Sequence, residues 1–296
     1  MINPLEFVNS LNMLDIRFVV GVPDSLLRHI CACITKHSST PNHVIANSEG
    51  SAIGLAIGHY LATQRPALVY MQNSGLGNAV NPLVSLADPT VFGIPMILMV
   101  GWRGEVLDDG KQLPDEPQHL KQGKITVPQL EILEIPYRIL DGQVTDVNVL
   151  MSELTRIACS RSGPVAIVVR KQAFASFEQV GKSEEIGSLT REEAITQVVD
   201  SLPDDVAVVC TTGMASRELF EIRKVSNRGH HRDFLTVGGM GHAGQIAAGI
   251  ALARPDRFFV CIDGDGAALM NLGGNAIIAD CSNLVHIVIN NGAYDS

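Results

Sequence analysis

Neither a run of lysine and arginine nor a long hydrophobic stretch occurs in these 296 residues, and the formal net charge is -9. An acidic chain without a basic run does not suit a nucleic acid as partner, which excludes that function class. The longest apolar runs, 94–100 and 257–262, are strand-sized, far shorter than the ~20 residues that cross a bilayer. The first twelve residues also lack the basic start and apolar core of a signal peptide. We therefore expect a soluble, cytoplasmic protein with no membrane partner.

Metal-type cysteine spacing is absent as well. The six cysteines are scattered through periodic segments. Cys31 and Cys33 lie two residues apart in a predicted helix, where side chains at that spacing face different directions. We therefore expect buried structural thiols and no metal-binding cysteine cluster.

The sequence does contain a regular alternation of apolar strands and amphipathic helices. Helical patterns occur at 24–37, 49–63, 76–88 and 147–159. Between and around them lie valine- and isoleucine-rich runs of strand length, at 17–22, 43–48, 67–73, 95–101, 137–140 and 164–170. Continuous apolar strands that alternate with helices are typical of a parallel sheet covered on both faces. The first half is therefore predicted to be a doubly wound α/β domain.

The same pattern restarts in the second half. After a polar, weakly periodic segment, a capping box from Thr190 to Glu193 opens a helix. Four strands follow, at 206–210, 233–237, 257–262 and 284–290. We expect two doubly wound parallel-sheet domains, 1–171 and 190–296, joined by a linker at 172–189. A doubly wound domain needs a helix over its last strand, so the second domain is expected to be incomplete at its C-terminus.

Ligands of open parallel sheets bind at the carboxyl ends of the strands, and several of these ends carry unusual residues. Glu49 starts a helix rich in glycine and alanine, and a long charged loop is predicted at 102–124. A glycine-rich segment, 238–245, follows another strand. Asp265 stands between two glycines after the strand at 257–262, and the next strand ends in the asparagine pair 290–291.

Asp265 and the asparagine pair suit a hard cation that carries a phosphate ligand. Magnesium prefers oxygen ligands in octahedral geometry, with few carboxylates and the phosphates of a bound molecule. Asp265 supplies the carboxylate, and Asn291 supplies a neutral oxygen from the adjacent strand end. The flanking glycines let the backbone amides of Gly266 and Ala267 approach a diphosphate. The simpler alternative is a pair of polar turns.

A nicotinamide dehydrogenase is a further alternative. Gly239, Gly241 and Gly244 form the G-x-G-x-x-G dinucleotide fingerprint between a strand and a helix, with Asp263 about one strand later. The fingerprint normally follows the first strand of its unit, whereas here the strand at 206–210 precedes it. This interpretation also leaves Asp265 without a role.

Together these motifs resemble those of thiamine-diphosphate enzymes. "GDG" at 264–266 followed by "NN" at 290–291 is similar to their magnesium and diphosphate motif. "NSEGSAIGLAIG" at 47–58 is similar to the start of the helix that carries their catalytic glutamate, which is then Glu49. The resemblance covers essentially the whole chain and implies a pyrimidine-binding domain followed by a diphosphate-binding domain. The middle domain of many such decarboxylases is absent, because only the short linker joins the two halves.

The resemblance implies thiamine diphosphate and Mg²⁺ as cofactors. Asn291 and the carbonyl of Ala293 would join Asp265 on the metal. "VGGMG" at 237–241 resembles the segment in which a carbonyl, here of Gly238, contacts the aminopyrimidine. In the same segment Met240 would be the apolar wedge that supports the bent cofactor.

"CTTG" at 210–213 resembles a turn near the diphosphate, which adds Thr212 and Gly213 to the cofactor site. Glu49 would hydrogen-bond the pyrimidine ring nitrogen. The chemistry implied is decarboxylation of a 2-oxo acid by way of a cofactor ylide and an enamine.

The resemblance is strongest to family members that convert 3-phosphonopyruvate to phosphonoacetaldehyde and carbon dioxide in phosphonate biosynthesis. A phosphonate carries up to three negative charges, so its site needs cations. The predicted loop at 102–124 offers the cations Arg103, His119, Lys121 and Lys124. Arginine suits a phosphonate best, because its guanidinium can donate two parallel hydrogen bonds to the phosphonate oxygens. The stretch at 106–114 departs from those members, because it is longer than in them.

Other residues are candidates for the same site. Asp24 and Ser25 begin a helix after the first strand, either as caps alone or with proton transfer as an added role. His242 follows the wedge segment and either faces the substrate or makes a structural hydrogen bond. Asn73 and Asn78, on the turn after the third strand, are expected to line the site.

In the resembled family the cofactor spans two subunits, so Glu49 and Asp265 would come from different chains of at least a homodimer. The helix after Glu49, rich in glycine and alanine, suits close subunit packing. A sulfopyruvate decarboxylase or a carboligase with the same cofactor is the nearest alternative. A non-catalytic partner subunit is another, although such a subunit would need neither Glu49 nor the metal motif.

Overall fold

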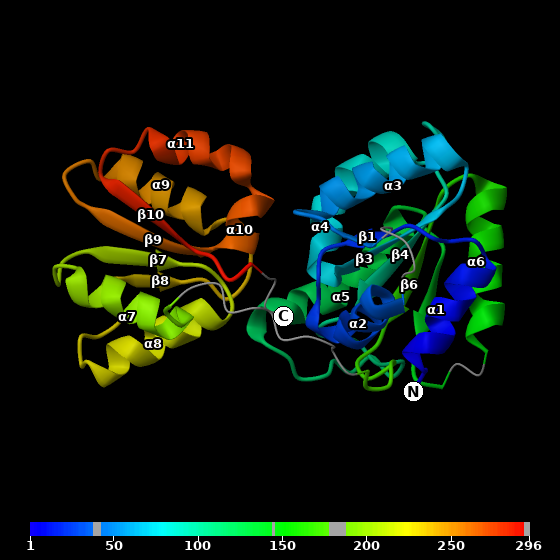
Figure 1. Cartoon of the computed structure of the whole chain (residues 1–296), viewed down its shortest axis with the longest axis horizontal. Coiled ribbons are helices and arrows are strands. Elements are labelled where there is room, and N and C mark those ends of the chain that lie inside the picture. The colour runs from blue at the N-terminus through cyan, green and yellow to red at the C-terminus, as the bar shows by residue number, and fades with distance from the viewer. Residues whose placement is uncertain (38–42, 144–145, 178–187, 293–296) are drawn as a thin grey trace. The chain divides into compact units, whose positions relative to one another are not determined.

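Ten strands form two separate parallel sheets in the described part of the chain, which is residues 1–37, 43–143, 146–177 and 188–292 of a computed structural model. The chain divides into two units, Met1–Gly181 and Lys182–Asp295 (Figure 1). The strand and helix alternation of the sequence therefore predicts the class of both units correctly. The boundaries of the predicted linker, 172–189, stay a prediction, and much of that segment lies outside the described residues.

The first unit has a six-stranded sheet in the order β2-β1-β3-β4-β6-β5. Its strands are β1 (Val19–Gly21), β2 (His43–Ile45), β3 (Ala67–Gln72), β4 (Met96–Gly101), β5 (Tyr137–Leu140) and β6 (Pro164–Val169). Strands β2 and β3 lie on either side of β1, so the strand order reverses there. A reversal of this kind opens a crevice at the carboxyl ends of the strands, where open sheets bind ligands.

Alternate side chains of each strand enter two different cores. On β3, Leu68 and Tyr70 belong to one core, while Val69 and Met71 belong to the other. The first core lies under α1 (Pro4–Met13), α2 (Arg28–His37) and α6 (Val147–Arg161). The second lies under α3 (Glu49–Thr63), α4 (Leu76–Pro82) and α5 (Pro117–Ile132), and Figure 1 shows α3 and α4 together over one face. Burial on both faces explains why these strands are continuous apolar runs.

The second unit has a four-stranded sheet in the order β10-β9-β7-β8. Its strands are β7 (Ala207–Cys210), β8 (Asp233–Leu235), β9 (Phe259–Gly264) and β10 (Leu284–Ile289). Helices α7 (Arg191–Ser201) and α8 (Met214–Val225) cover one face, and α9 (Ala243–Ala253) and α11 (Asn275–Ala279) cover the other. The short helix α10 (Asp265–Met270) follows β9 directly. The strand order reverses between β7 and β9, which places the ligand crevice of this unit at their carboxyl ends.

Several local predictions are confirmed and some are wrong. The capping box is present: Thr190 Oγ1 accepts a hydrogen bond from Glu193 N, and Glu193 Oε2 accepts one from Thr190 N at 2.8 Å. The predicted loop 102–124 is wrong in its second part, because α5 begins at Pro117. Proline at the first helical position needs no N–H partner and starts a helix readily. The predicted helix 76–88 changes to a π-helical turn at Leu83–Ala87, next to Pro82, which cannot donate a backbone hydrogen bond.

The six cysteines are all unpaired. Four of them, Cys33, Cys210, Cys261 and Cys281, are buried as expected, whereas Cys159 is exposed. Among the described residues, every helix is too short or too polar to traverse a lipid bilayer.

Candidate active site

Glu49 lies at the carboxyl end of β2, as the first residue of α3. Ser48 caps the helix by accepting a hydrogen bond from Ser51 N. The Glu49 side chain is buried, and its Oε2 accepts a hydrogen bond from Asn78 Nδ2 at 2.8 Å. A Cβ added at Gly75 would lie 2.3 Å from Glu49 Oε1, so only glycine leaves room for the carboxylate there. The turn after β3 therefore holds a buried carboxyl group in one fixed position.

Asp24 is a second buried carboxyl group, at the carboxyl end of β1. Its Oδ2 accepts a hydrogen bond from Leu26 N and caps the short turn Ser25–Leu27. Its Oδ1 is buried and has no hydrogen-bond partner among the described residues. Burial raises the pKa of Asp24 to about 6, although the positive charge of Arg103 opposes the shift. The structure confirms Asp24 as a cap and adds an unpartnered oxygen with a shifted pKa, which a cap alone does not need.

Arg103, at the carboxyl end of β4, is the cation closest to this carboxyl group. Its Nε and Nη2 donate hydrogen bonds to the two carboxylate oxygens of Asp115 at 3.0 and 2.7 Å. Its Nη1 donates to Ser25 Oγ at 3.2 Å. A guanidinium has five N–H donors, so one remains on each terminal nitrogen of Arg103. Two N–H donors on one guanidinium can bind the oxygens of an oxyanion together.

Asp115 organises this cluster and was not a candidate from the sequence. Besides Arg103, its carboxylate accepts hydrogen bonds from the backbone N–H groups of Gly104 and Glu116, both at 2.8 Å, and from His119 Nδ1 at 2.9 Å. The hydrogen bonds from Arg103 hold the pKa of Asp115 well below its usual range, although partial burial opposes them. The only sequence signal was an aspartate four residues before a histidine at a helix start.

The remaining predicted substrate residues have different surroundings. Asn73 is buried, and its Nδ2 donates to the carbonyl of Arg103 and to Thr126 Oγ1, both at 2.9 Å. Its Oδ1 accepts from the backbone N of Arg103 at 3.2 Å. Asn73 therefore positions the backbone of Arg103. His119 is buried against Asp115, whereas Lys121 lies exposed on α5 and not in a loop.

The shifted pKa of Asp24 predicts a pH-dependent stability. The folded state keeps the Asp24 proton up to about pH 6, whereas the unfolded chain loses it near the ordinary value of 3.8. Between these values the folded state binds more protons, so this residue's contribution to stability falls as pH rises through the window. We expect Asp24→Asn to remove a penalty of about 3 kcal/mol at pH 7.5 and almost none at pH 3.

Urea unfolding followed by the fluorescence of the single tryptophan, Trp102, measures this effect within the first unit. The matched control is Asp109→Asn, because Asp109 is exposed in the same unit. An equal stability change at both pH values would show that Asp24 is not held protonated.

In the second unit the structure brings together the two halves of the predicted metal motif. Strands β9 and β10 are parallel and in register, with Gly264 opposite Ile289. Asp265 Oδ2 accepts a hydrogen bond from Gly292 N at 3.1 Å, and Gly292 follows Asn291. A carboxylate has about four acceptor positions, so Asp265 keeps capacity for a cation. Ala293 lies outside the described residues.

The other oxygen of Asp265 has a local partner. Its Oδ1 accepts a hydrogen bond from Gly266 N at 2.9 Å. The amide that was predicted to contact a diphosphate therefore bonds the carboxylate here, and its contact with phosphate stays a prediction. Ala267 is buried in the same turn of α10.

The glycine-rich segment after β8 is held by a histidine. Gly239 and Gly241 adopt φ of 69° and 88°, which favours glycine at both positions. His242 Nδ1 lies 3.0 Å from the carbonyl oxygen of Gly239, and because a carbonyl only accepts, Nδ1 carries a hydrogen. His242 therefore makes the structural hydrogen bond that was one of its two predicted roles. Met240 in this turn is half-buried.

Thr212 and Gly213 form the turn between β7 and α8, at the reversal of strand order. Gly213 has φ 93° and ψ -143°, a conformation that residues with a Cβ rarely adopt. The neighbouring Thr211 has a buried Oγ1 without a hydrogen-bond partner among the described residues. A positive-φ glycine before a helix, next to an unpartnered hydroxyl, fits a turn that contacts an anion.

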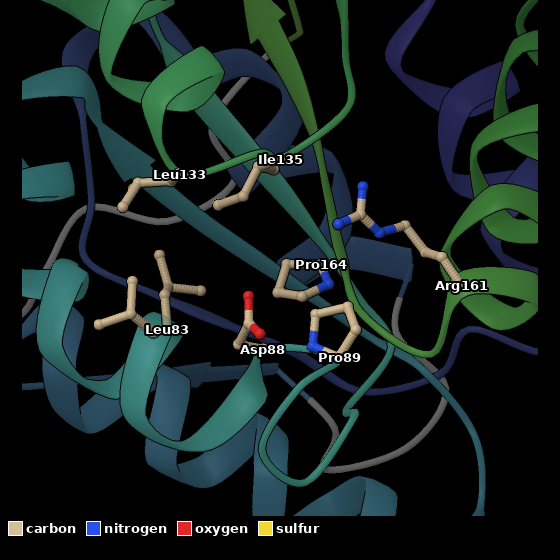
Figure 2. A pocket seen from close by; sticks show the side chains of 8 residues that line it. Leu83, Asp88, Pro89, Leu133, Ile135, Arg161 and Pro164 are labelled. Carbon is tan, nitrogen blue, oxygen red and sulfur yellow. The ribbon is translucent and has the colours of Figure 1, made fainter.

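The first unit also has a small hollow, at the amino end of β6. Figure 2 shows Pro89 and Pro164 at its wall, with Leu83, Leu133 and Ile135 around it and the polar ends of Asp88 and Arg161. Ligands of parallel sheets bind at the opposite, carboxyl edge. We assign this hollow no role in the chemistry.

Comparison with known proteins identifies the class. Residues 6–125 match the family described as thiamine pyrophosphate enzyme, N-terminal TPP binding domain, and residues 210–296 match the corresponding C-terminal TPP binding domain. The chain belongs to the thiamine pyrophosphate enzymes, and thiamine diphosphate is its cofactor. The predicted family, the two-domain α/β fold and this cofactor are thus confirmed. The dinucleotide interpretation of Gly239, Gly241 and Gly244 is set aside.

Particular relatives narrow the class to decarboxylases. Phosphonopyruvate decarboxylase of Streptomyces viridochromogenes is 31% identical, and the match covers 100% of this chain and 75% of the relative. Phosphonopyruvate decarboxylase of Streptomyces hygroscopicus is 32% identical, and the match covers 100% of this chain and 74% of that protein. Sulfopyruvate decarboxylase of Methanosarcina acetivorans is 29% identical over 84% of this chain and 66% of that protein. The predicted class of enzyme, a carboxy-lyase that depends on thiamine diphosphate, is thereby confirmed.

Proposed function

We propose that this chain decarboxylates 3-phosphonopyruvate to phosphonoacetaldehyde and carbon dioxide. The observation that carries the proposal is the cluster at the carboxyl ends of β1 and β4. There Arg103 presents two remaining N–H donors beside Ser25 and the buried Asp24. Two donors on one guanidinium suit the phosphonate end of the substrate. The two phosphonopyruvate decarboxylases among the relatives, each matched over the whole chain, support the same substrate.

We assign cofactor contacts to both units. Residues 1–171 form the pyrimidine-binding domain, in which Glu49 Oε1 shares a proton with the pyrimidine ring nitrogen. Asn78 supports this role because it holds Oε2 and fixes the direction of the carboxyl group.

Residues 190–296 form the diphosphate-binding domain. Asp265, Asn291 and the carbonyl of Ala293 hold Mg²⁺. The contact between Asp265 and Gly292 supports this set, because it brings the two strand ends together. We propose Thr212, Gly213, Gly266 and Ala267 as diphosphate contacts. Gly238 and Met240 contact the pyrimidine and support the cofactor.

Thiamine diphosphate, when bound, supplies the electron sink that accepts the electron pair left by the departing carbon dioxide. The protein must then deliver one proton to the carbon that carried the carboxylate. We propose Asp24 as the donor, because its pKa of about 6 keeps a protonated fraction near neutral pH. Its unpartnered Oδ1 holds that proton and regains one from water after each turnover. His242 is the second candidate donor, through Nε2 when both ring nitrogens carry a hydrogen, because the Nδ1 hydrogen is bonded to the carbonyl of Gly239.

The phosphonate end is held by the two remaining donors of Arg103 and by Ser25 Oγ. Asp115 keeps the guanidinium in place, Asn73 positions the backbone of Arg103, and His119 supports Asp115. The role of Lys121 as a substrate contact stays a prediction, because its side chain is exposed on α5.

Arg103→Lys tests this subsite. Lysine keeps the positive charge but loses the guanidinium donors, so at least one charge-assisted hydrogen bond of about 1.5–3 kcal/mol is lost. We expect kcat/KM for phosphonopyruvate to fall roughly 10–100-fold, while turnover of pyruvate, which has no phosphonate, changes little. Steady-state carbon dioxide release with both substrates measures the effect, and Lys111→Met, which removes an exposed charge from the 106–114 stretch, is the control. An equal loss of kcat/KM with both substrates would show that Arg103 does not bind the phosphonate group.

Sulfopyruvate is the second candidate substrate. Its sulfonate presents the same kind of oxyanion to Arg103, and one relative is a sulfopyruvate decarboxylase. A sulfonate carries one charge fewer than a phosphonate dianion. The wild-type ratio of kcat/KM for the two substrates therefore decides between them.

We also propose a homodimer or larger oligomer in which Glu49 and Asp265 of different chains serve one cofactor. Support comes from α3, where Leu55 and Leu61 are 44% and 63% exposed. Beside them, Gly54 and Gly58 have open space where a Cβ would be, so a second helix could approach closely. Six unpaired thiols support a cytoplasmic location, because such thiols persist in a reducing compartment.

A further inference from the structure

Three potential metal ligands, none of them among the predicted magnesium residues, converge on one face of the second sheet. Cys261 and Asp263 alternate along β9 and so point to the same face. His286 of β10 lies directly opposite Cys261 in the register of the two strands. The sulfur of Cys261, a carboxylate oxygen of Asp263 and a ring nitrogen of His286 all lie within 4.8 Å of one another.

The three side chains are enclosed beneath α9. Cys261 packs with Val209, Ala243 and Ala247 in the core under that helix. Asp263 is 2% exposed, and the His286 side chain is 11% exposed. A Cβ added at Gly244 would lie 3.6 Å from His286 Nε2, so the α9 backbone covers the ring closely.

Two of the three groups are already oriented. Asp263 Oδ1 accepts a hydrogen bond from Gly264 N at 3.0 Å, and its Oδ2 lies 3.2 Å from His286 Nε2. In tetrahedral zinc sites the metal lies about 2.0–2.3 Å from each ligand, which puts ligand atoms roughly 3.3–3.8 Å apart. The spacing of this cluster reaches that range with small side-chain rotations.

We propose that Cys261, Asp263 and His286 bind a transition-metal dication of the zinc type. Sulfur and imidazole ligands favour Zn²⁺ over Mg²⁺, which prefers oxygen ligands only. The ion displaces the thiol proton to solvent, and thiolate and carboxylate together balance its double charge. The site would clamp β9 to β10, the strands that lead to Asp265 and Asn291.

Cobalt(II) titration of the metal-free protein tests the proposal. A Co²⁺ ion bound by thiolate absorbs strongly in the near ultraviolet, whereas Co²⁺ at the oxygen ligands of Asp265 does not. We expect this band to saturate at one equivalent per chain and to disappear on addition of Zn²⁺. Thermal denaturation with and without Zn²⁺ gives a second readout, in which the metal raises the midpoint.

Variants assign the band to these residues. We expect Cys261→Ser to abolish it and His286→Gln to weaken Co²⁺ binding at least tenfold, with circular dichroism confirming that both remain folded. Cys281→Ser is the matched control, because Cys281 is a buried thiol of the same unit outside the cluster. Asp265→Asn should keep the band, which separates this site from the magnesium site. Absence of the band in the wild type, its survival in Cys261→Ser, or its loss in Cys281→Ser or Asp265→Asn would overturn the proposal.

Discussion

Replacement of Glu49 by glutamine is expected to lower kcat by roughly 10²–10⁴-fold, the range that a positioned acid–base group contributes. Glutamine has nearly the same shape, and its carbonyl oxygen still accepts the hydrogen bond from Asn78 Nδ2. It cannot exchange a proton with the pyrimidine ring nitrogen. The fold and the position of the side chain should therefore survive while the proton function is lost.

Three measurements make the Glu49 result specific. Carbon dioxide release gives kcat, calorimetric titration gives the affinity for thiamine diphosphate, and the thermal midpoint reports on folding. Glu6→Gln is the control, because Glu6 is an exposed carboxylate on α1 in the same unit. Near-normal turnover of Glu49→Gln with intact cofactor binding would remove Glu49 from the mechanism.

Asp265→Asn is expected to weaken binding of the magnesium and thiamine diphosphate pair. The substitution removes the one carboxylate of the proposed metal site and leaves neutral oxygens only. Loss of a residue that merely supports a metal ligand costs about 10–100-fold in affinity, and removal of the charged ligand should cost more. Activity should return in part at high magnesium concentration, because mass action opposes the weaker binding.

Titration of thiamine diphosphate at several magnesium concentrations measures this loss. Asp280→Asn is the control, since Asp280 is an exposed aspartate of the same unit at the end of α11. Unchanged cofactor affinity in Asp265→Asn would contradict the assignment of Asp265 to the metal.

The sequence predicted the framework of the site because that framework follows from local patterns. Apolar runs of strand length marked all ten strands, and the runs of β3, β4 and β6 are buried on both faces. The helix at Glu49 began where the pattern placed it, after a serine cap. The contact between Asp265 and the turn after Asn291 was also predictable, because the ends of parallel strands meet at one edge of a sheet.

The contacts that need tertiary structure were not predictable in the same way. Asp115 reaches Arg103 only because the chain turns back between them, and no local pattern marks that contact. The charged composition of 117–124 suggested a loop, although Pro117 opens a helix there.

The cluster of Cys261, Asp263 and His286 could not be predicted from the sequence, because it depends on the register of two strands. His286 follows Cys261 by 25 positions, and only the pairing of β9 with β10 places the two side by side. The sequence spacing of the cysteines therefore held no sign of a metal site.

The most direct test of the proposed function is product analysis with the wild-type protein. Phosphonopyruvate, sulfopyruvate and pyruvate are each incubated with the protein, thiamine diphosphate and Mg²⁺, and released carbon dioxide and aldehyde are measured. We predict that phosphonopyruvate gives the highest kcat/KM, with phosphonoacetaldehyde as the product and no turnover when thiamine diphosphate is left out. A higher kcat/KM for sulfopyruvate or pyruvate, or no cofactor-dependent carbon dioxide from phosphonopyruvate, would contradict it.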